Sequence, residues 1–225
     1  MTTIGLIGSG NLGSTVARLA VAAGYEVVLS NSRWPETLAD LVAELGPWAS
    51  AGTPVEAANE GDLVVVSVPL KAYRSVPVEP LTGKVVIDTN NYYPERDGEF
   101  PELTDGSSTS SELLQRHLPA AKVVKGFNNI YFRHLAELAR PAGAADRTAL
   151  VIAGDDGPAK ATVTAFLDAI GYDAVDVGSL ADSWRCQPGN PVYGTPYAAG
   201  ADFLTAPAKP APAAEISELL AAARR

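Results

Sequence analysis

A glycine-rich turn near the start of the chain has the spacing of a phosphate-binding loop. The run Gly8-Ser9-Gly10-Asn11-Leu12-Gly13 fits G-x-G-x-x-G, directly after an apolar run at 3–7 and before a helical pattern. The first glycine permits a tight turn, the second lets the backbone approach a pyrophosphate, and the third lets helix and strand pack closely. The helix amino end adds unpaired N–H donors and partial positive charge. The run predicts a dinucleotide site, with a plain tight turn as the alternative.

The residues after the next apolar run distinguish the two nicotinamide dinucleotides. NAD sites usually place Asp or Glu there, where it accepts hydrogen bonds from the ribose hydroxyls. This chain has Ser30-Asn31-Ser32-Arg33 instead. A carboxylate would repel a 2′-phosphate, whereas hydroxyls, an amide and a guanidinium bind one through charge-assisted hydrogen bonds. Asn31, Ser32 and Arg33 therefore predict NADP(H), the alternative being that Arg33 is a solvated loop arginine.

The usual catalytic groups of dehydrogenases are missing. No tyrosine is followed four residues later by lysine; the nearest arrangement is Tyr92 with Arg96, and arginine does not titrate usefully. The one cysteine, Cys186, is interpreted as an inert buried thiol. With His117 and His134 as the two histidines, no zinc dehydrogenase centre can be assembled and no metal is expected. Hydride transfer to a flat ring needs chiefly stacking, so positioning would dominate catalysis.

These residues must be positioned by an alternation of strands and helices. Continuous apolar runs predict strands covered on both faces, and apolar spacing of three and four predicts helices. The strands expected are 3–7, 26–29, 62–66, 84–87, 122–124, 149–153 and 172–177. The helices expected are 12–23, 36–45, 158–170 and 215–223. The chain is therefore predicted to be an α/β protein with a Rossmann-type doubly wound, mostly parallel sheet and a loop-rich C-terminal segment.

The alternation of strand and helix patterns stops after Gly178, which predicts that the chain is organised in two parts. Residues 1–178, which hold the alternating strands and helices, are expected to form an NADP-binding Rossmann domain, without the all-helical second domain of the large hydroxyacid dehydrogenases. Residues 179–225 hold six prolines and read as a Pro-rich extension with a terminal helix, packed on the same domain or on a partner subunit. The polar segment 88–106 is turn-rich, and long loops in a compact fold often carry function.

Composition narrows the class of protein. The chain has 225 residues with 17 basic and 26 acidic side chains, a net charge of −9, which leaves no basic surface for a nucleic-acid partner. No apolar run approaches the roughly 20 residues of a membrane helix, so no membrane partner is expected. The first 24 residues hold five glycines and do not read as a signal peptide. The expectation is a soluble cytoplasmic protein.

Several runs together resemble the NADP oxidoreductases that depend on the deazaflavin coenzyme F420. The similarity covers roughly residues 3–180, and the same fold occurs in the NADPH-binding domain of STEAP-type membrane metalloreductases, so the family does not fix the acceptor. The runs that carry it are Ile4 to Gly13, Val27 to Arg33, Ser67-Val68-Pro69, Val86 to Asn91, Lys125 to Ile130 and Ala153 to Asp156.

The resemblance implies roles for residues at matching positions. Ser9, Asn11 and Leu12 would form the pyrophosphate turn, and Ser32 with Arg33 would hold the 2′-phosphate. The riboses would be bordered by Ser67, Val68 and Pro69. The nicotinamide or its acceptor would lie beside Asn90, Asn128 and Asn129, which agrees with the rule that ligands sit outside the carboxyl ends of parallel strands.

Two regions depart from that family and would face the acceptor. These are 90–94, which is more aromatic, and 183–189, which replaces a more apolar helical tail. An aromatic lid over a planar ring could form from Tyr92, Tyr93, Trp184 and Tyr193, the alternative being that each packs its own loop. An anionic tail could be bound by Arg96, Arg133, His134 and Arg185, the alternative being that the arginines are isolated surface residues and that His134, as is more common, is a helix-surface histidine. Asp155 and Asp156 read as caps of the helix at 158–170.

The expected function is hydride transfer between NADPH and a planar acceptor, preferably coenzyme F420, with Asn128 and Asn129 positioning the rings. One alternative is an NADPH-dependent reductase of a flavin, imine or carbonyl compound, with Tyr92 or Tyr93 as proton donor. Another is an NADP(H)-sensing module without turnover. The expected partners are the small-molecule or deazaflavin acceptor and a second copy of the chain in a homodimer.

Overall fold

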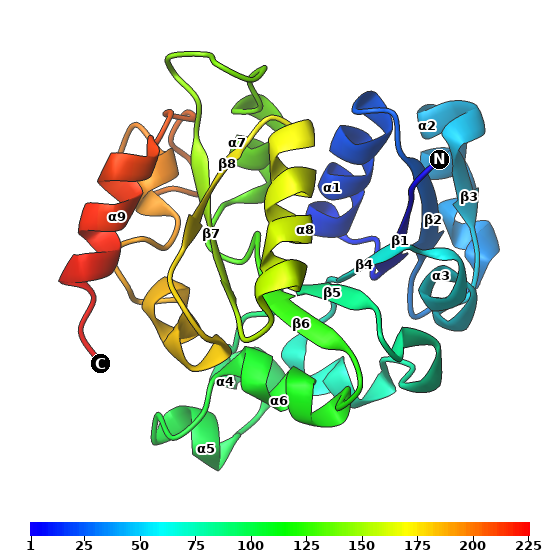
Figure 1. Ribbon diagram of the computed structural model, residues 1–225, viewed down its shortest axis with the longest axis horizontal. Helices are drawn as coiled ribbons and strands as arrows, with labels where there is room; N and C mark the ends of the chain where they lie inside the picture. Colours follow the sequence, from blue (N-terminus) through cyan, green and yellow to red (C-terminus); the bar gives the residue numbers. More distant parts are fainter.

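A computed structural model describes all residues, 1–225, and contains one eight-stranded sheet. The sheet order is β3-β2-β1-β4-β5-β6-β7-β8, and every neighbouring pair is parallel except β6 with β7 (Figure 1). Its first six strands follow the 3-2-1-4-5-6 order of dinucleotide-binding folds, which confirms the predicted Rossmann-type sheet. The strands are β1 (Thr3–Ile7), β2 (Glu26–Ser30), β3 (Ala49–Ala51), β4 (Leu63–Val66), β5 (Val85–Asp88), β6 (Lys122–Lys125), β7 (Ala149–Gly154) and β8 (Asp173–Asp176).

Short helices and longer ones connect the strands. The α-helices are α1 (Asn11–Ala22), α2 (Ala39–Leu45), α3 (Pro54–Glu60), α4 (Pro94–Asp97), α5 (Pro101–Thr104), α6 (Ser110–His117), α7 (Phe132–Glu137), α8 (Gly157–Ala169) and α9 (Ala213–Ala222). The 3₁₀ turns are η1 (Pro35–Leu38), η2 (Gly46–Trp48), η3 (Leu70–Ser75), η4 (Glu79–Leu81), η5 (Leu180–Cys186) and η6 (Thr195–Tyr197). No helix is both long and apolar enough to cross a lipid bilayer.

Two apolar cores lie on the two faces of the sheet, because successive strand residues point to opposite sides. In β4, Leu63 and Val65 belong to one core while Val64 and Val66 belong to the other. The first core contains apolar side chains of α1, α8 and α9, and the second contains side chains of α3, η3 and α6. Burial on both faces explains why these strands read as continuous apolar runs.

The direction in which successive strands are added to the sheet reverses between β1 and β4, and this brings the loops after these strands together. The chain runs outward from β1 through β2 to β3, then returns to β4 on the other side of β1. The turn after β1 and the turn after β4 therefore open a crevice at the carboxyl ends of the strands. The turns after β5 and β6 follow on the same edge, since both strands are parallel to β4.

The structure corrects some expected elements. The helix expected at 36–45 is broken into η1 and α2, because Pro35 begins a 3₁₀ turn and Leu38 leaves helical geometry before Ala39. Short β3, with the sequence Ala-Ser-Ala, gave no apolar signal. Helices α3 and α6 were also missed, although each begins with a capping box: Thr53 with Glu56 in α3, and Thr109 with Glu112 in α6.

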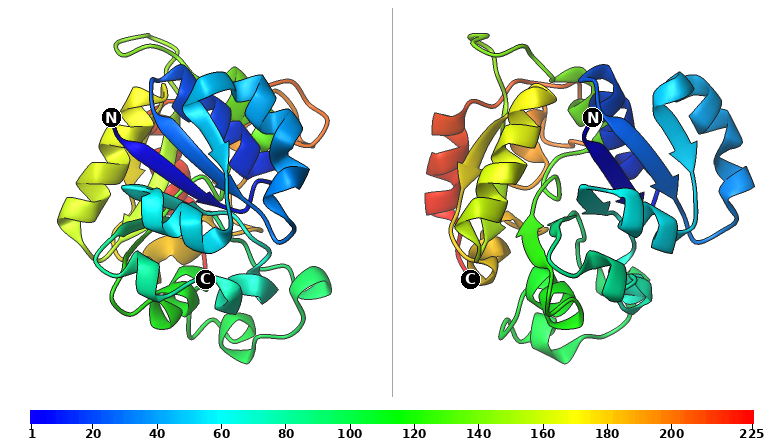
Figure 2. Two further views of the ribbon diagram at one scale, coloured as in Figure 1. Left: turned by 90° about the vertical axis from the view of Figure 1, so that its right-hand side faces the viewer. Right: turned by 45° about the vertical axis from the view of Figure 1, so that its right-hand side comes forward.

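Residues 179–225 pack against the same core as the sheet. The Tyr197 hydroxyl donates to the Ala149 carbonyl in β7, and Val192 and Tyr197 are fully buried. Helix α9 packs on β7 and β8, at the opposite end of the molecule from β3 (Figure 2). The loop between η5 and α9 thereby returns over the crevice end of the sheet, where Gly194 donates to the Asn129 carbonyl.

Candidate dinucleotide and acceptor cleft

A cleft in two connected halves lies over the carboxyl ends of β1, β4, β5 and β6. The halves share Gly10 and the turn 67–69. The cationic half, about 470 Å³, is lined by Ile7, Gly8, Ser9, Gly10, Asn31, Ser32, Arg33, Pro54, Ser67, Val68, Pro69, Lys71, Ala72 and Ser75. The aromatic half, about 630 Å³, adds Asn11, Leu12, Thr89, Asn90, Asn91, Tyr93, Arg96, Asn128, Asn129, Ile130, Tyr131, Phe132, Tyr193, Gly194, Phe203 and Leu204.

The glycine turn has the geometry that a pyrophosphate requires. Gly8 has φ +106°, and a Cβ there would lie 2.1 Å from the Ser67 carbonyl oxygen. A Cβ on Gly13 would lie 2.0 Å from the Gly8 carbonyl oxygen, so helix and turn touch there. A Cβ on Gly10 meets nothing within 4 Å. Gly10 therefore leaves open space over the start of α1, which has neither a side-chain cap nor an acidic residue in its first turn.

The loop after β2 is folded by its own side chains. Ser9 Oγ donates to the Ser30 carbonyl, which ties the glycine turn to β2. Asn31 Oδ1 accepts from the Arg33 amide, and Asn31 Nδ2 donates to Thr37 Oγ1. The Asn31 amide therefore shapes the loop, while Ser32 and Arg33 are left exposed at the cleft.

The charge of the cationic half suits a phosphate. Arg33 and Lys71 line it, neither side chain is in an ion pair, and no Asp or Glu is among the lining residues. The lining of this half is therefore positively charged, although the whole chain has a net charge of −9. The sequence reasoning missed Lys71, and its only signal is that it follows Ser67-Val68-Pro69 by two residues.

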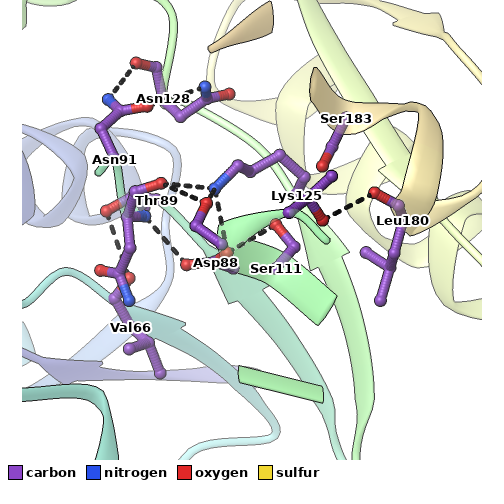
Figure 3. A network of polar contacts seen from close by, with 12 residues as sticks. Val66, Asp88, Thr89, Asn91, Ser111, Lys125, Asn128, Leu180 and Ser183 are labelled. Carbon is purple, nitrogen blue, oxygen red and sulfur yellow. Dashed lines mark hydrogen bonds and ion pairs between the residues drawn. The ribbon is translucent and has the colours of Figure 1, made fainter. Parts of the chain in front are cut away.

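A buried ion pair lies beneath the aromatic half (Figure 3). Lys125 Nζ, at the end of β6, lies 3.0 Å from Asp88 Oδ2 at the end of β5, and both side chains are fully buried. The ammonium also donates to Ser110 Oγ and the Asn90 carbonyl, while Ser111 Oγ donates to Asp88 Oδ2. Asp88 Oδ1 accepts from the Asn90 amide. This network fixes the backbone of Asn90, whose Oδ1 in turn accepts from the Val68 amide.

Asn128 and Asn129 line the aromatic half, and their amide groups hold the C-terminal segment. Asn128 Nδ2 donates to the Cys186 carbonyl and to Asn91 Oδ1. Asn129 Nδ2 donates to the Val192 carbonyl and to the Tyr197 hydroxyl. These contacts give both residues a structural role. That they also position the nicotinamide and acceptor rings stays a prediction.

Aromatic side chains from distant segments form the wall of the aromatic half. Tyr93 comes from the loop after β5, and its hydroxyl is hydrogen-bonded to the hydroxyl of Tyr193. The Arg96 guanidinium lies 4.8 Å from the centre of the Tyr93 ring. Phe203 packs edge-on against Tyr193, with ring centres 5.8 Å apart, and against Tyr131. The aromatic half therefore offers flat apolar surface and the hydrogen-bonded hydroxyl groups of Tyr93 and Tyr193.

Several candidates lie elsewhere. The expected lid included Tyr92, which is outside the cleft: it packs edge-on against Phe100, and its hydroxyl accepts from the Phe100 amide. Tyr92 is therefore not placed to donate a proton to a ligand there. Trp184 also lies outside the cleft, where Arg185 and Arg225 stack on its ring.

The remaining polar candidates have structural partners. His134 is buried and bonded to the Ala206 carbonyl, so the helix-surface interpretation was wrong. Asp156 caps α8 as expected, whereas Asp155 accepts from the Leu180 amide instead. Cys186 is a buried free thiol as expected, and burial raises its pKa to about 11. No group of three His, Cys, Asp or Glu side chains is placed to share a metal ion.

Comparisons with known proteins agree with this geometry. Residues 3–92 match the model of the family described as NADP oxidoreductase coenzyme F420-dependent. The chain is 29% identical to hypothetical protein SMa0349 of Sinorhizobium meliloti, with a TM-score of 0.74 over 86% of this chain and 93% of that one. It is 25% identical to a proposed F420-dependent NADP reductase of Arthrobacter sp. FB24, with a TM-score of 0.67 over 81% and 87% of the two chains.

A curated relative is larger than this chain. The metalloreductase STEAP3 of Rattus norvegicus is 31% identical over 183 residues, which are 80% of this chain and 34% of that protein. The chain thus spans about a third of the length of this relative.

Proposed function

We propose that this chain, which belongs through residues 3–92 to the family of coenzyme F420-dependent NADP oxidoreductases, is an enzyme that moves a hydride between NADP(H) and a planar acceptor. The observation that carries the proposal is the continuity of the cleft. A cationic half that fits phosphates joins, across Gly10 and the turn 67–69, an aromatic half that fits flat rings.

The choice of NADP(H) is supported by the charges of the cationic half. A 2′-phosphate carries about two negative charges near neutral pH, like other phosphate monoesters. Arg33 and Lys71 can meet that charge with no competing carboxylate in the half. The residues proposed to bind the dinucleotide are Gly8, Ser9, Gly10, Asn11, Leu12, Gly13, Asn31, Ser32, Arg33, Ser67, Val68, Pro69 and Asn90. All of these except Gly13 line the cleft, and to them we add Lys71, which lines the cationic half. When bound, NADPH supplies a hydride from its nicotinamide ring.

The preferred acceptor is the deazaflavin coenzyme F420. Family membership and similarity to the Arthrobacter protein support this choice. The aromatic half adds a physical reason, since a tricyclic ring can stack on its tyrosine and phenylalanine side chains. Its volume of about 630 Å³ lies in the range of small-molecule sites. The homodimer and the cytoplasmic location expected from the sequence stay predictions.

One observation is compatible with a second acceptor class. Reduction of a flavin, an imine or a carbonyl takes up a proton beside the hydride, as reduction of a deazaflavin does, and the hydrogen-bonded hydroxyls of Tyr93 and Tyr193 line the aromatic half. An NADPH-dependent reductase of such small molecules is therefore the second candidate. A sensing module without turnover would need no such hydroxyl pair.

The test is a spectrophotometric assay of the purified protein with NADPH and oxidised deazaflavin. Bleaching of the deazaflavin band, much faster with NADPH than with NADH, is expected. Parallel reactions with a flavin and a cyclic imine, followed by loss of NADPH absorbance, identify the second class. If NADPH binds, as measured by its fluorescence, and no acceptor is reduced, the chain is a sensing module and the proposal is wrong.

A further inference from the structure

We propose that Tyr93, supported by Tyr193 and Arg96, donates the proton that accompanies the hydride into the acceptor. This inference rests on the proposed function and deepens it, because it names a catalytic residue and the class of acceptor. The observation behind it is the hydrogen bond between the two hydroxyls on the wall of the aromatic half. No other pair of hydroxyl side chains in that half is joined in this way.

The two tyrosines are held from different parts of the fold. The Tyr93 amide donates to Asp97 Oδ2 over 3.0 Å, which fixes the loop after β5. Tyr193 lies between η5 and η6; its amide donates to the Asn190 carbonyl, and Phe203 packs on its ring. Two side chains 100 residues apart in the sequence are thereby brought hydroxyl to hydroxyl beside the cleft.

The surrounding amides favour Tyr193 as the donor within the pair. Asn128 Nδ2 donates to the Cys186 carbonyl and to Asn91 Oδ1, so the Asn91 oxygen is occupied as an acceptor. Asn91 Nδ2 then donates to the Asn128 carbonyl and, over 3.4 Å, to the Tyr193 hydroxyl oxygen. With that oxygen accepting from Asn91, the Tyr193 hydroxyl can direct its own proton to Tyr93, and we take this one of the two possible directions. The Tyr93 proton is left for a ligand in the cleft.

The contacts of the pair give the two hydroxyls different tasks. Burial raises the pKa of Tyr193, which therefore keeps its proton and can donate it in a hydrogen bond. A phenolate formed on Tyr93 would accept that hydrogen bond and would lie beside the Arg96 guanidinium, 4.8 Å from its ring. Arg96 is also paired with Asp97, which holds the guanidinium in place. Tyr93 is thus the catalytic acid, and Tyr193 is a positioning residue.

The proton from Tyr93 balances the negative charge that the hydride brings to the acceptor. The hydride and its electron pair form a new C–H bond on the acceptor carbon, and the adjacent or conjugated π bond opens toward a nitrogen or oxygen. The Tyr93 O–H bond breaks as the new N–H or O–H bond forms, and Tyr93 regains its proton from water. The acceptor class is therefore a planar compound that gains both hydride and proton, such as a deazaflavin, a flavin, an imine or a carbonyl.

The decisive experiment compares Tyr93→Phe and Tyr193→Phe with Tyr92→Phe as the matched control. Tyr92 is the neighbouring tyrosine, and its hydroxyl lies outside the cleft against Phe100 and Thr104. The readouts are single-turnover deazaflavin reduction by NADPH, NADPH affinity by fluorescence, and affinity of oxidised deazaflavin for the enzyme–NADP⁺ complex. Thermal unfolding confirms that each variant folds.

The proposal predicts that Tyr93→Phe lowers the reduction rate about 10²-fold with NADPH affinity unchanged. Tyr193→Phe should give a smaller loss, and Tyr92→Phe none. Tyr93→Phe should also weaken deazaflavin binding to the NADP⁺ complex, because the hydrogen bond to the ring is lost. The wild-type reaction should be slower in D₂O than in H₂O. The ratio of these two rates should change in Tyr193→Phe, and a merely structural role of Tyr193 would leave that ratio unchanged.

Two failures are distinguishable. If the wild type reduces deazaflavin and Tyr93→Phe matches Tyr92→Phe, only this inference is overturned. If Tyr93→Phe does not fold, a wild-type rate equal in H₂O and D₂O overturns it instead. If the wild type reduces no acceptor, the proposed function is overturned and this inference with it.

Discussion

The cationic and aromatic halves of the cleft are built in different ways. The cationic half comes from short segments next to β1, β2 and β4, where backbone geometry and a few polar residues do most of the work. The aromatic half combines loops after β5 and β6 with residues 193–204 of the C-terminal segment. A site made of local backbone can be recognised from spacing, whereas one made by distant side chains depends on the whole fold.

The largest expected effect lies under the aromatic half. Lys125→Met leaves Asp88 as an unpaired charge in a fully buried position, which should lower the free energy of unfolding by about 3–5 kcal/mol. Lys122→Met, at the exposed start of the same strand, is the control and should change little. Urea denaturation of both variants measures the difference. Equal stabilities would mean that the buried pair does not hold this half together.

A pair of glycine substitutions separates packing from binding in the turn that both halves share. Gly13→Ala forces a Cβ against the Gly8 carbonyl and should destabilise the fold by about 1–3 kcal/mol. Gly10→Ala enters open space, so stability should be kept while NADPH affinity falls, because the methyl group takes the place of the pyrophosphate. Thermal unfolding and NADPH fluorescence titrations test both. Unchanged NADPH binding by Gly10→Ala would remove the pyrophosphate from this turn.

The cationic half should carry the preference for NADPH. Arg33→Ala and Lys71→Ala each remove a charge-assisted contact of about 1.5–3 kcal/mol, and should weaken NADPH binding accordingly. NADH, which lacks the 2′-phosphate, is the control ligand and should bind each variant as it binds the wild type. Titrations by nicotinamide fluorescence give the ratio of the two affinities. A ratio that stays constant would contradict the 2′-phosphate assignment.

The smallest effect concerns Asp97, which joins the two halves by accepting from the Lys71 amide and the Tyr93 amide. Burial raises the pKa of this carboxyl, but hydrogen bonds from Arg96 and the two amides outweigh it and leave the pKa below its ordinary value. A lowered pKa stabilises the fold above the unfolded value near 3.9, and that stability is lost as the pH falls through the folded pKa. In Asp97→Asn, the free energy of unfolding should therefore fall less than in the wild type as the pH is lowered below about 4. An unchanged acid profile of unfolding would contradict this.

Local signals predicted the cationic half well. The alternation of apolar runs gave the sheet, and the glycine turn and Arg33 lie together at its switch point. Lys71 was missed because an exposed lysine in a 3₁₀ turn has no signature of its own. The ring-positioning role predicted for Asn128 and Asn129 is untested, and their amides are used to hold residues 186–197.

The aromatic half was less predictable for a physical reason. Tyr93 has an extended backbone, in which neighbouring side chains point to opposite sides, and sequence alone could not say whether Tyr92 or Tyr93 faces the cleft. The partner of Tyr93 comes from a loop 100 residues later. Asp88 and Lys125 are each the last residue of an apolar strand, and their pairing follows only from the adjacency of β5 and β6.

The central claim is that one cleft brings a nicotinamide and a planar acceptor together for hydride transfer. The most direct test uses NADPH deuterated at C4, in separate 4R and 4S forms, with oxidised deazaflavin, whose C5 retains the transferred atom. Mass spectrometry of the reduced deazaflavin should find deuterium from one of the two forms and none from the other. Reduced deazaflavin without deuterium from either form would contradict direct transfer in this cleft.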